Sequence, residues 1–150
     1  MPRYYFEDFT VGRVFEAAGP VISQEEIIEF ASKYDPQTFH VDPDAARHSS
    51  FGGLVASGWQ TLAFAMRMTC DAYLLEAATF GSPGVDEVRW TKPVRPGDTL
   101  RLRMTVLEAR PSGSKPDRGT VVFRREVFNQ NGELVMHMRN MTLFQRRPAA

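Results

Sequence analysis

Cysteine is almost absent from this chain of 150 residues, in which Cys70 stands alone. A single cysteine excludes an internal disulfide bond and any metal site built from several thiolates. Cys70 falls within a helical pattern, where a buried and unreactive thiol is the expected state of a free cysteine. The three histidines are scattered along the chain, so we also expect no metal centre.

An excess of charge of either sign is lacking too, because Lys and Arg total 18 and Asp and Glu total 18. This balance indicates no polyanionic partner such as nucleic acid. No stretch reaches the roughly 18 uncharged apolar residues that a membrane span requires, and the first residues lack a basic segment followed by an apolar one. We therefore expect a soluble, cytoplasmic protein without membrane contact. The length predicts one domain over residues 1–150.

The polar residues that suggest chemistry lie between residues 35 and 60. Asp35 and His40 are five residues apart in a segment broken by Pro36, so no continuous helix separates them and both side chains can share a water molecule. Downstream, Gly58 leads into a long apolar helix, whose first N–H groups lack partners within the helix and lie at the positive end of its dipole. An acid/base pair beside such donors suits addition of water to an activated double bond, or hydrolysis of an ester or thioester.

The segment of residues 35–42 resembles the hydratase motif of the MaoC-like dehydratases and (R)-specific enoyl-CoA hydratases of the hotdog superfamily. That motif reads Asp, any residue, Asn, Pro, any residue, His, any residue, Asp. Here both aspartates and His40 keep their spacing, and Gln37-Thr38 replaces Asn-Pro. Ser57 replaces a histidine of the family just before the helix, and Met66 stands where some members carry a serine. The further matches in this region are Phe51, Leu54, Val55 and Gly58.

The resemblance covers about Tyr5 to Gln145 and implies an α+β hotdog fold, in which an antiparallel sheet wraps around a long central helix. It implies that two subunits pair edge to edge, as a homodimer or a larger homo-oligomer, with active sites at or near the interface. It also implies a hydro-lyase of fatty acid metabolism that interconverts trans-2-enoyl thioesters and (R)-3-hydroxyacyl thioesters. The substrate brings its own coenzyme A, or an acyl carrier protein, and no other cofactor is expected.

Asp35, His40 and Gly58 are the catalytic residues that this resemblance implies. In the hypothesis, His40 takes a proton from a water molecule held between it and Asp35, and Asp35 positions that water and returns a proton to C2. The Gly58 N–H donates a hydrogen bond to the thioester carbonyl, and such a donor is typically worth about 3 kcal/mol in the transition state. A residue without Cβ suits this position because it lets the ligand approach closely.

Structural interpretations of the same residues compete with these roles. Asp35 could simply cap the turn at Pro36, and His40 could be a buried structural histidine. Ser57 is interpreted as a helix cap together with Gln60, since no Gly-x-Ser-x-Gly elbow makes it a nucleophile. Four residues could line an acyl pocket, but aromatic residues and methionines at helical spacing are usually core, so they are interpreted as core: Phe51, Trp59, Leu62 and Met66. The other residues assigned no functional role are Asp42 as a cap, His48 and His137 on the surface, and Lys92 and Arg95 as solvated charges.

Two other functions stay open beside hydration. A hotdog thioesterase would use the same oxyanion donor and a carboxylate such as Asp71 or Glu76 to activate water, but it would leave the Asp35/His40 spacing unused. A non-catalytic subunit that binds acyl thioesters or serves assembly would account for the replaced Asn-Pro pair and the replaced histidine.

The hydrophobic pattern predicts the elements of this fold. A Ser23/Glu26 capping box opens a helix that stops at Asp35-Pro36, and Asp42 caps a very short helix after it. An apolar helix from Ser57 to about Ala78 is expected to be buried. The strands are expected at Val11–Ala17, ended by Gly19-Pro20, then at Val85–Trp90, Thr99–Glu108, Thr120–Phe128 and Glu133–Phe144, the last two joined by a hairpin at Asn131-Gly132.

Overall fold

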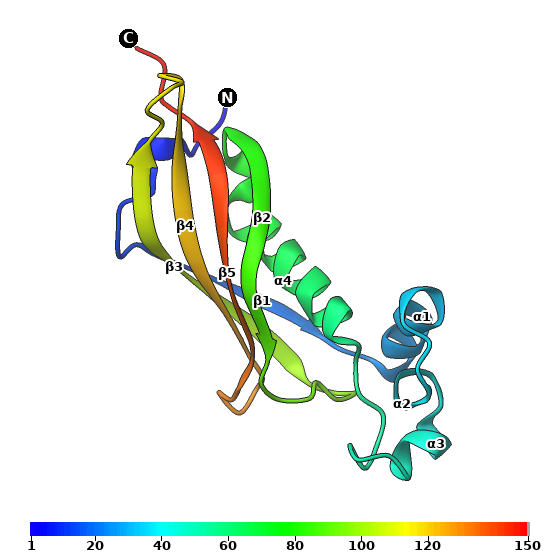
Figure 1. Cartoon of the computed structure of the whole chain (residues 1–150). Helices are drawn as coiled ribbons and strands as arrows, with labels where there is room; N and C mark the ends of the chain where they lie inside the picture. The colour runs from blue at the N-terminus through cyan, green and yellow to red at the C-terminus, as the bar shows by residue number, and fades with distance from the viewer. Residues whose placement is uncertain (150) are drawn as a thin grey trace.

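The computed structural model describes residues 1–149, which contain a single antiparallel sheet of five strands in the order β1-β3-β4-β5-β2. The strands are β1 (Val14–Val21), β2 (Thr79–Trp90), β3 (Thr99–Pro111), β4 (Arg118–Phe128) and β5 (Leu134–Gln145). Helix α4 (Gly58–Ala72) lies along one face of this sheet, while α1 (Gln24–Tyr34), α2 (Thr38–Val41) and α3 (Pro43–Arg47) gather beyond one end of it (Figure 1). The predicted α+β arrangement, a sheet wrapped on one long helix, is confirmed.

The core lies between the sheet and α4, and strand β3 shows why. Its apolar side chains alternate with arginines, so one face of the strand is buried and the other is exposed to solvent. Ala65 and Met68 of α4 belong to the same buried cluster, which fixes the helix against the centre of the sheet. The fully buried residues of β3 are Leu100, Leu102, Met104 and Val106.

An aromatic cluster ends α4 earlier than the apolar pattern predicts. Tyr73 leaves helical geometry at φ −162° and is fully buried, with its ring centroid 5.4 Å from that of Phe9 and 5.8 Å from that of Phe123. These rings come from three distant parts of the chain, and aromatic pairs at such distances pack favourably. The helix therefore ends at Ala72 and not near Ala78, and a short 3₁₀ helix, Leu74–Glu76, follows it.

The prediction that Gly19-Pro20 ends the first strand is wrong, because β1 continues to Val21. A Cβ on Gly19 would lie 2.8 Å from the Met68 sulfur and 2.9 Å from the Leu100 carbonyl oxygen, so the glycine is needed for close packing within the strand. Pro20 is tolerated because β1 is an edge strand and its register with β3 shifts between Ala18 and Val21.

Strand β2 starts at Thr79, six residues before the predicted Val85. Its first half contains Gly81 and Gly84, and the pairing with β5 shifts register at three places. Nearly all its side chains are exposed, so this half shows none of the alternation that marks a half-buried strand. The strand forms the other edge of the sheet.

Helix α4 is also less buried than its composition predicts. The side chains of Trp59 and Met66 are 60% and 45% exposed, although the opposite face of the helix lies in the core. Both side chains border cavities, as described below. Within residues 1–149, no helix combines the length and the apolar character that crossing a membrane requires.

Candidate active site

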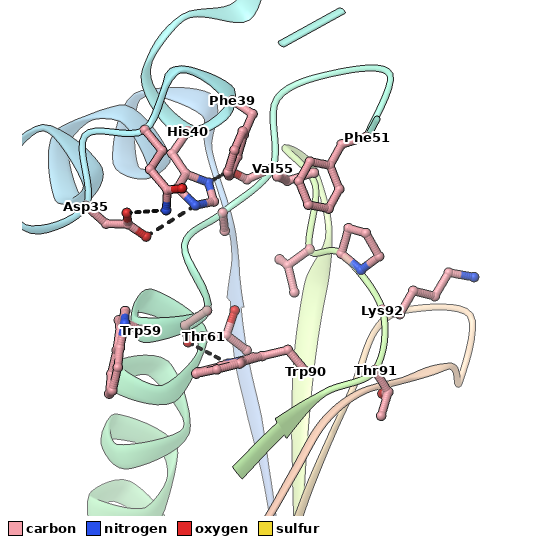
Figure 2. Close-up of a pocket in the computed structure, with 15 residues that line it drawn as sticks. Asp35, Phe39, His40, Phe51, Val55, Trp59, Thr61, Trp90, Thr91 and Lys92 are labelled. Carbon is pink, nitrogen blue, oxygen red and sulfur yellow. Dashed lines mark hydrogen bonds and ion pairs between the residues drawn. The ribbon is translucent and has the colours of Figure 1, made fainter. Parts of the chain in front are cut away.

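Asp35 and His40 are brought together by the turn between α1 and α2. The predicted capping box of Ser23 and Glu26 starts α1, and Asp35 ends it as the C-cap residue. His40 follows on the short helix α2, and its Nε2 lies 3.2 Å from Asp35 Oδ2. Figure 2 shows the two side chains directed toward each other. Both are largely removed from solvent, with 17% of the Asp35 side chain and 7% of the His40 side chain exposed.

The backbone fixes which nitrogen of His40 faces Asp35. The Nδ1 atom lies 2.7 Å from the carbonyl oxygen of Val55, and a carbonyl oxygen can only accept, so Nδ1 carries the hydrogen. Val55 is held in turn, since its N–H donates to the Phe39 carbonyl at 3.1 Å and the next residue, Ala56, donates to Val94 at 2.8 Å. A neutral His40 therefore presents the lone pair of Nε2 to the site.

Two donors hold the Asp35 carboxylate. Gln37 Nε2 donates to Oδ1 at 2.7 Å and Ser57 Oγ donates to Oδ2 at 2.7 Å. Burial raises the pKa of Asp35, but these two hydrogen bonds and the neighbouring His40 outweigh it, and the net direction is downward. Asp35 is therefore ionised at neutral pH.

Gln37 and Ser57 are two of the positions at which the sequence departs from the hydratase motif, beside Thr38 and Met66. At both positions the residue that replaces the motif's residue donates a hydrogen bond to Asp35. Ser57 is completely buried, and its Oγ also caps α4 by accepting from Trp59 N at 3.3 Å. The Gln60 half of the predicted capping box is absent, because Gln60 Nε2 donates to the Glu26 carbonyl at 3.1 Å instead.

Gly58 does permit a close approach, although by a side chain of the protein. A Cβ at this position would lie 2.5 Å from Trp90 Cε2, and Trp90 Nε1 donates to the Gly58 carbonyl at 2.8 Å. No pattern in the sequence predicts Trp90 at this place, since it stands at the end of an exposed strand. Among residues 1–149 no group accepts a hydrogen bond from the Gly58 N–H.

A cavity of about 390 Å³ connects these groups. Asp35, His40 and Gly58 all border it, as do the rings of Phe51 and Trp59. The interpretation of these two aromatic residues as core is therefore wrong, because both contribute to the wall of the cavity. The other bordering residues drawn in Figure 2 include Phe39, Val55, Thr61, Trp90, Thr91 and Lys92.

Several residues considered from the sequence lie away from this cavity. Asp42 caps α3 through hydrogen bonds from Asp44 N and Ala45 N, as predicted. His48 is exposed and His137 is half-buried on β5. No group of three or more His, Cys, Asp or Glu side chains within the described residues is arranged to hold a metal ion.

The charged residues near the cavity mouth are engaged by the protein. Lys92 borders the cavity and forms an ion pair with Glu133. Arg95 Nη2 donates to the Phe51 carbonyl at 2.6 Å, which holds the loop that carries this ring. Arg95 is thus more than the solvated charge that the sequence indicates, since it anchors one wall of the site.

Comparison with known proteins agrees with the motif. A family model described as the MaoC like domain matches residues 8–125. The chain belongs to the MaoC-like family. This family includes hydratases and dehydratases, and the chain is 32% identical over 108 residues to the 3-hydroxyacyl-thioester dehydratase Z of Mycobacterium tuberculosis, covering 71% of this chain and 72% of that protein.

Two solved structures bear on the family and on the fold. A MaoC-like dehydratase from Rhodospirillum rubrum is 40% identical with a TM-score of 0.87, covering 97% of this chain and 99% of that one. A Mycobacterium tuberculosis protein with a double hotdog fold superimposes with a TM-score of 0.81 at 20% identity, covering 98% of this chain and 46% of that one. The predicted hotdog fold is confirmed.

Proposed function

We propose that this MaoC-like protein adds water reversibly to trans-2-enoyl thioesters, with coenzyme A as the carrier, and yields (R)-3-hydroxyacyl thioesters. One observation carries the proposal. The Asp35/His40 pair, with 3.2 Å between Oδ2 and Nε2, borders the same cavity as an N–H group of Gly58 that has no partner within the described residues. Addition of water needs both features, a proton carrier and a donor for the carbonyl oxygen.

The proposed reaction starts with a water molecule beside the Asp35/His40 pair. The water donates to Asp35 and to the lone pair of His40 Nε2. As its oxygen bonds to C3, one proton moves to Nε2, and the thioester oxygen gains negative charge that the Gly58 N–H stabilises. The proton on Nε2 then moves to C2, so one water is added and the protein ends as it began.

This scheme assigns proton return to His40 and not to Asp35. The lowered pKa of Asp35 makes its carboxylate a poor proton carrier at neutral pH. The same charge stabilises the imidazolium that forms on His40, whose Nδ1–H stays bonded to the Val55 carbonyl throughout. Asp35 thus positions the water and supplies charge.

The competing functions have less support from the positions of their residues. Asp71, considered for a thioesterase, pairs with Arg67 at 3.1 Å on the exposed side of α4, and Glu76 is exposed beyond the end of the helix. Neither borders the cavity of Asp35 and His40. The non-catalytic alternative rested on the changed motif, yet Gln37 and Ser57 both bond to Asp35.

We also propose that the protein works as a homodimer, in which β2 pairs with β2 of a second copy. This strand is an edge of the sheet with no strand beyond it within residues 1–149. Exposed edges are commonly covered by pairing. The edge carries the large apolar side chains Phe80, Val85 and Trp90, each 45–49% exposed.

The proposed function is tested by measuring two products of one reaction at the same time. Wild-type protein is mixed with crotonyl-CoA while the enoyl-thioester absorbance and free thiol are both followed. We expect the absorbance to fall without release of thiol. Release of thiol would indicate a thioesterase, and no change with short, long or branched enoyl-CoA would favour the binding subunit.

A further inference from the structure

A second cavity, of about 440 Å³, runs along α4 on the side of β2, β4 and β5. Its walls are mostly apolar, with Leu62 and Met66 from the helix and Val85 and Met138 from the sheet. Trp59 borders this cavity and also the one that holds Asp35 and His40. The two cavities therefore meet at one indole ring, close to Gly58.

Arg125 borders this apolar cavity, and its side chain is buried without a counter-charge. The residue is only 5% exposed, and its Nε has no hydrogen-bond partner within residues 1–149. Glu126, the next residue, pairs with Arg124 on the opposite face of the strand. A guanidinium stays charged inside proteins, and burying it unpaired is costly, so a missing partner is expected to come from outside the described chain.

Another buried polar group beside Arg125 is also unsatisfied. Asn140 and Thr142 border the cavity, and Asn140 Oδ1 has no partner in the described residues, while its Nδ2 is 3.4 Å from Thr142 Oγ1. Burial raises the pKa of the neighbouring Tyr73 hydroxyl to about 12, against the opposing effect of the guanidinium. Burial lowers the pKa of Arg125, and the neighbouring Tyr73 only partly opposes this effect. Besides Tyr73, Cys70 is the other titratable group that influences the guanidinium.

The Arg125 guanidinium lies within reach of an acyl chain whose thioester is bound at Gly58. Trp90, which packs on Gly58, is opposite Met136 of β5. Arg125 is opposite Met138, which is the next residue of β5 on the same face of the strand. On the helix side, the wall from Trp59 to Met66 is roughly 10 Å long at the rise of an α-helix. An acyl chain that passes Trp59 would therefore run between apolar walls toward Arg125.

We propose that the second cavity holds the acyl tail of the substrate and that Arg125 binds a carboxylate at the end of this tail. The preferred substrates would then be thioesters of dicarboxylic acids. The apolar walls accept the methylene groups, and the guanidinium fork matches a carboxylate in two parallel hydrogen bonds. Thr142 and the Asn140 amide add further hydrogen-bonding groups. This inference rests on the proposed function for the position of the thioester, and it adds the substrate class.

The test compares saturated acyl-CoA pairs that differ only in the tail, which ends in a methyl group or in a carboxylate. Saturated chains of about six to ten carbons cannot be hydrated and bracket the length of the cavity. Titration calorimetry should show that the carboxylate form binds wild-type protein tighter by roughly 100-fold at the best length. Arg125→Met should remove this preference. Arg124→Met, on the exposed face of the same strand, is the matched control and should retain it.

Thermal unfolding of Arg125→Met separates a ligand site from a structural role. We expect a melting temperature equal to or above that of the wild type, and the same oligomeric state, because no ion pair within the subunit is lost. A lower melting temperature together with a dissociated oligomer would mean that a second subunit pairs with Arg125, and the proposal would be wrong. Equal binding of both tail types at every length would also overturn it.

Turnover of the matching unsaturated thioesters keeps the two proposals apart. Hydration of methyl-ended chains without any preference for the carboxylate would leave the proposed function standing and reject the Arg125 site. A carboxylate preference in binding, lost in Arg125→Met but without hydration of either substrate, would support the Arg125 site and reject the proposed function.

Discussion

The two cavities that meet at Trp59 differ in how the protein satisfies their polar groups. In the first, His40 bonds to Val55, and Asp35 receives hydrogen bonds from Gln37 and Ser57. In the second, Arg125 Nε and Asn140 Oδ1 have no partner within residues 1–149. The first set is oriented before any ligand arrives, whereas the second set has bonding capacity that remains unused.

This difference matches two different tasks. A group that moves a proton must be held in one orientation and one tautomer, and hydrogen bonds within the chain provide this. A group that recognises a substrate gains most when its bonds form only with the correct ligand, because a wrong ligand leaves buried polar groups unpaired. The first cavity fits chemistry and the second fits recognition.

The largest loss of activity is expected when the proton carrier of the first cavity is removed. We expect His40→Ala to lower kcat by about 10³-fold or more, because general acid–base catalysis typically supplies 10²–10⁴-fold. Asp35→Asn should cause a similar loss, since the amide cannot stabilise the imidazolium. Enoyl-CoA absorbance measures both. His48→Ala, at an exposed position away from the cavity, is the control and should retain full activity.

The next largest effect is expected from Gly58→Ala. The new Cβ collides with the Trp90 ring, which must leave its place over the helix terminus, and a displacement of this kind can cost about 10²-fold in rate. The three atoms nearest to that Cβ all belong to Trp90. The double variant Gly58→Ala/Trp90→Ala should therefore recover to the activity of Trp90→Ala alone. A double variant as slow as Gly58→Ala would show that the substrate itself needs the space.

A smaller effect is expected from Ser57→Ala, which tests the support of Asp35. Loss of the hydrogen bond raises the pKa of Asp35, so the acidic limb of the kcat/KM profile should move to higher pH. Loss of the helix cap should also lower the free energy of unfolding by about 1 kcal/mol. Gln37→Ala removes the other donor and should shift the same limb without affecting the cap. An unchanged profile in both variants would mean that Asp35 does not govern this limb.

The smallest expected effect is on stability at low pH. Because the pKa of Asp35 is below its ordinary value of 3.8 in the folded protein, the carboxylate stabilises the fold above that pH. This contribution is lost as the pH falls from 3.8 through the lower folded value. The difference in unfolding free energy between wild type and Asp35→Asn should therefore shrink in that range. Denaturant titrations at several pH values measure it, and a constant difference would contradict the lowered pKa.

Local signals in the sequence predicted much of this fold. The Ser23/Glu26 box and the Asp42 cap depend on residues within three positions of each other, and both form as expected. The alternation along β3 likewise gave its buried face. The end of α4 was not predictable in this way, because rings distant in the chain decide where Tyr73 lies.

The site was predicted in part for the same reason. Asp35 and His40 are close in sequence, and the motif placed them together. The support from Ser57 comes from 22 positions away, and the indole of Trp90 comes from 32 positions beyond Gly58. Arg125 did have a sequence signal, since strand alternation puts it on the same face as Phe123 and Val127.

The central claim is that the Asp35/His40 pair adds water across the double bond, with Gly58 as the oxyanion donor. The most direct test is to run the reaction on crotonyl-CoA in deuterium oxide and analyse the product by NMR and chiral chromatography. The account predicts a 3-hydroxyacyl thioester with the R configuration at C3 and deuterium at C2, formed by the wild type and not by His40→Ala. Free thiol, the S product, or the same product from His40→Ala would contradict it.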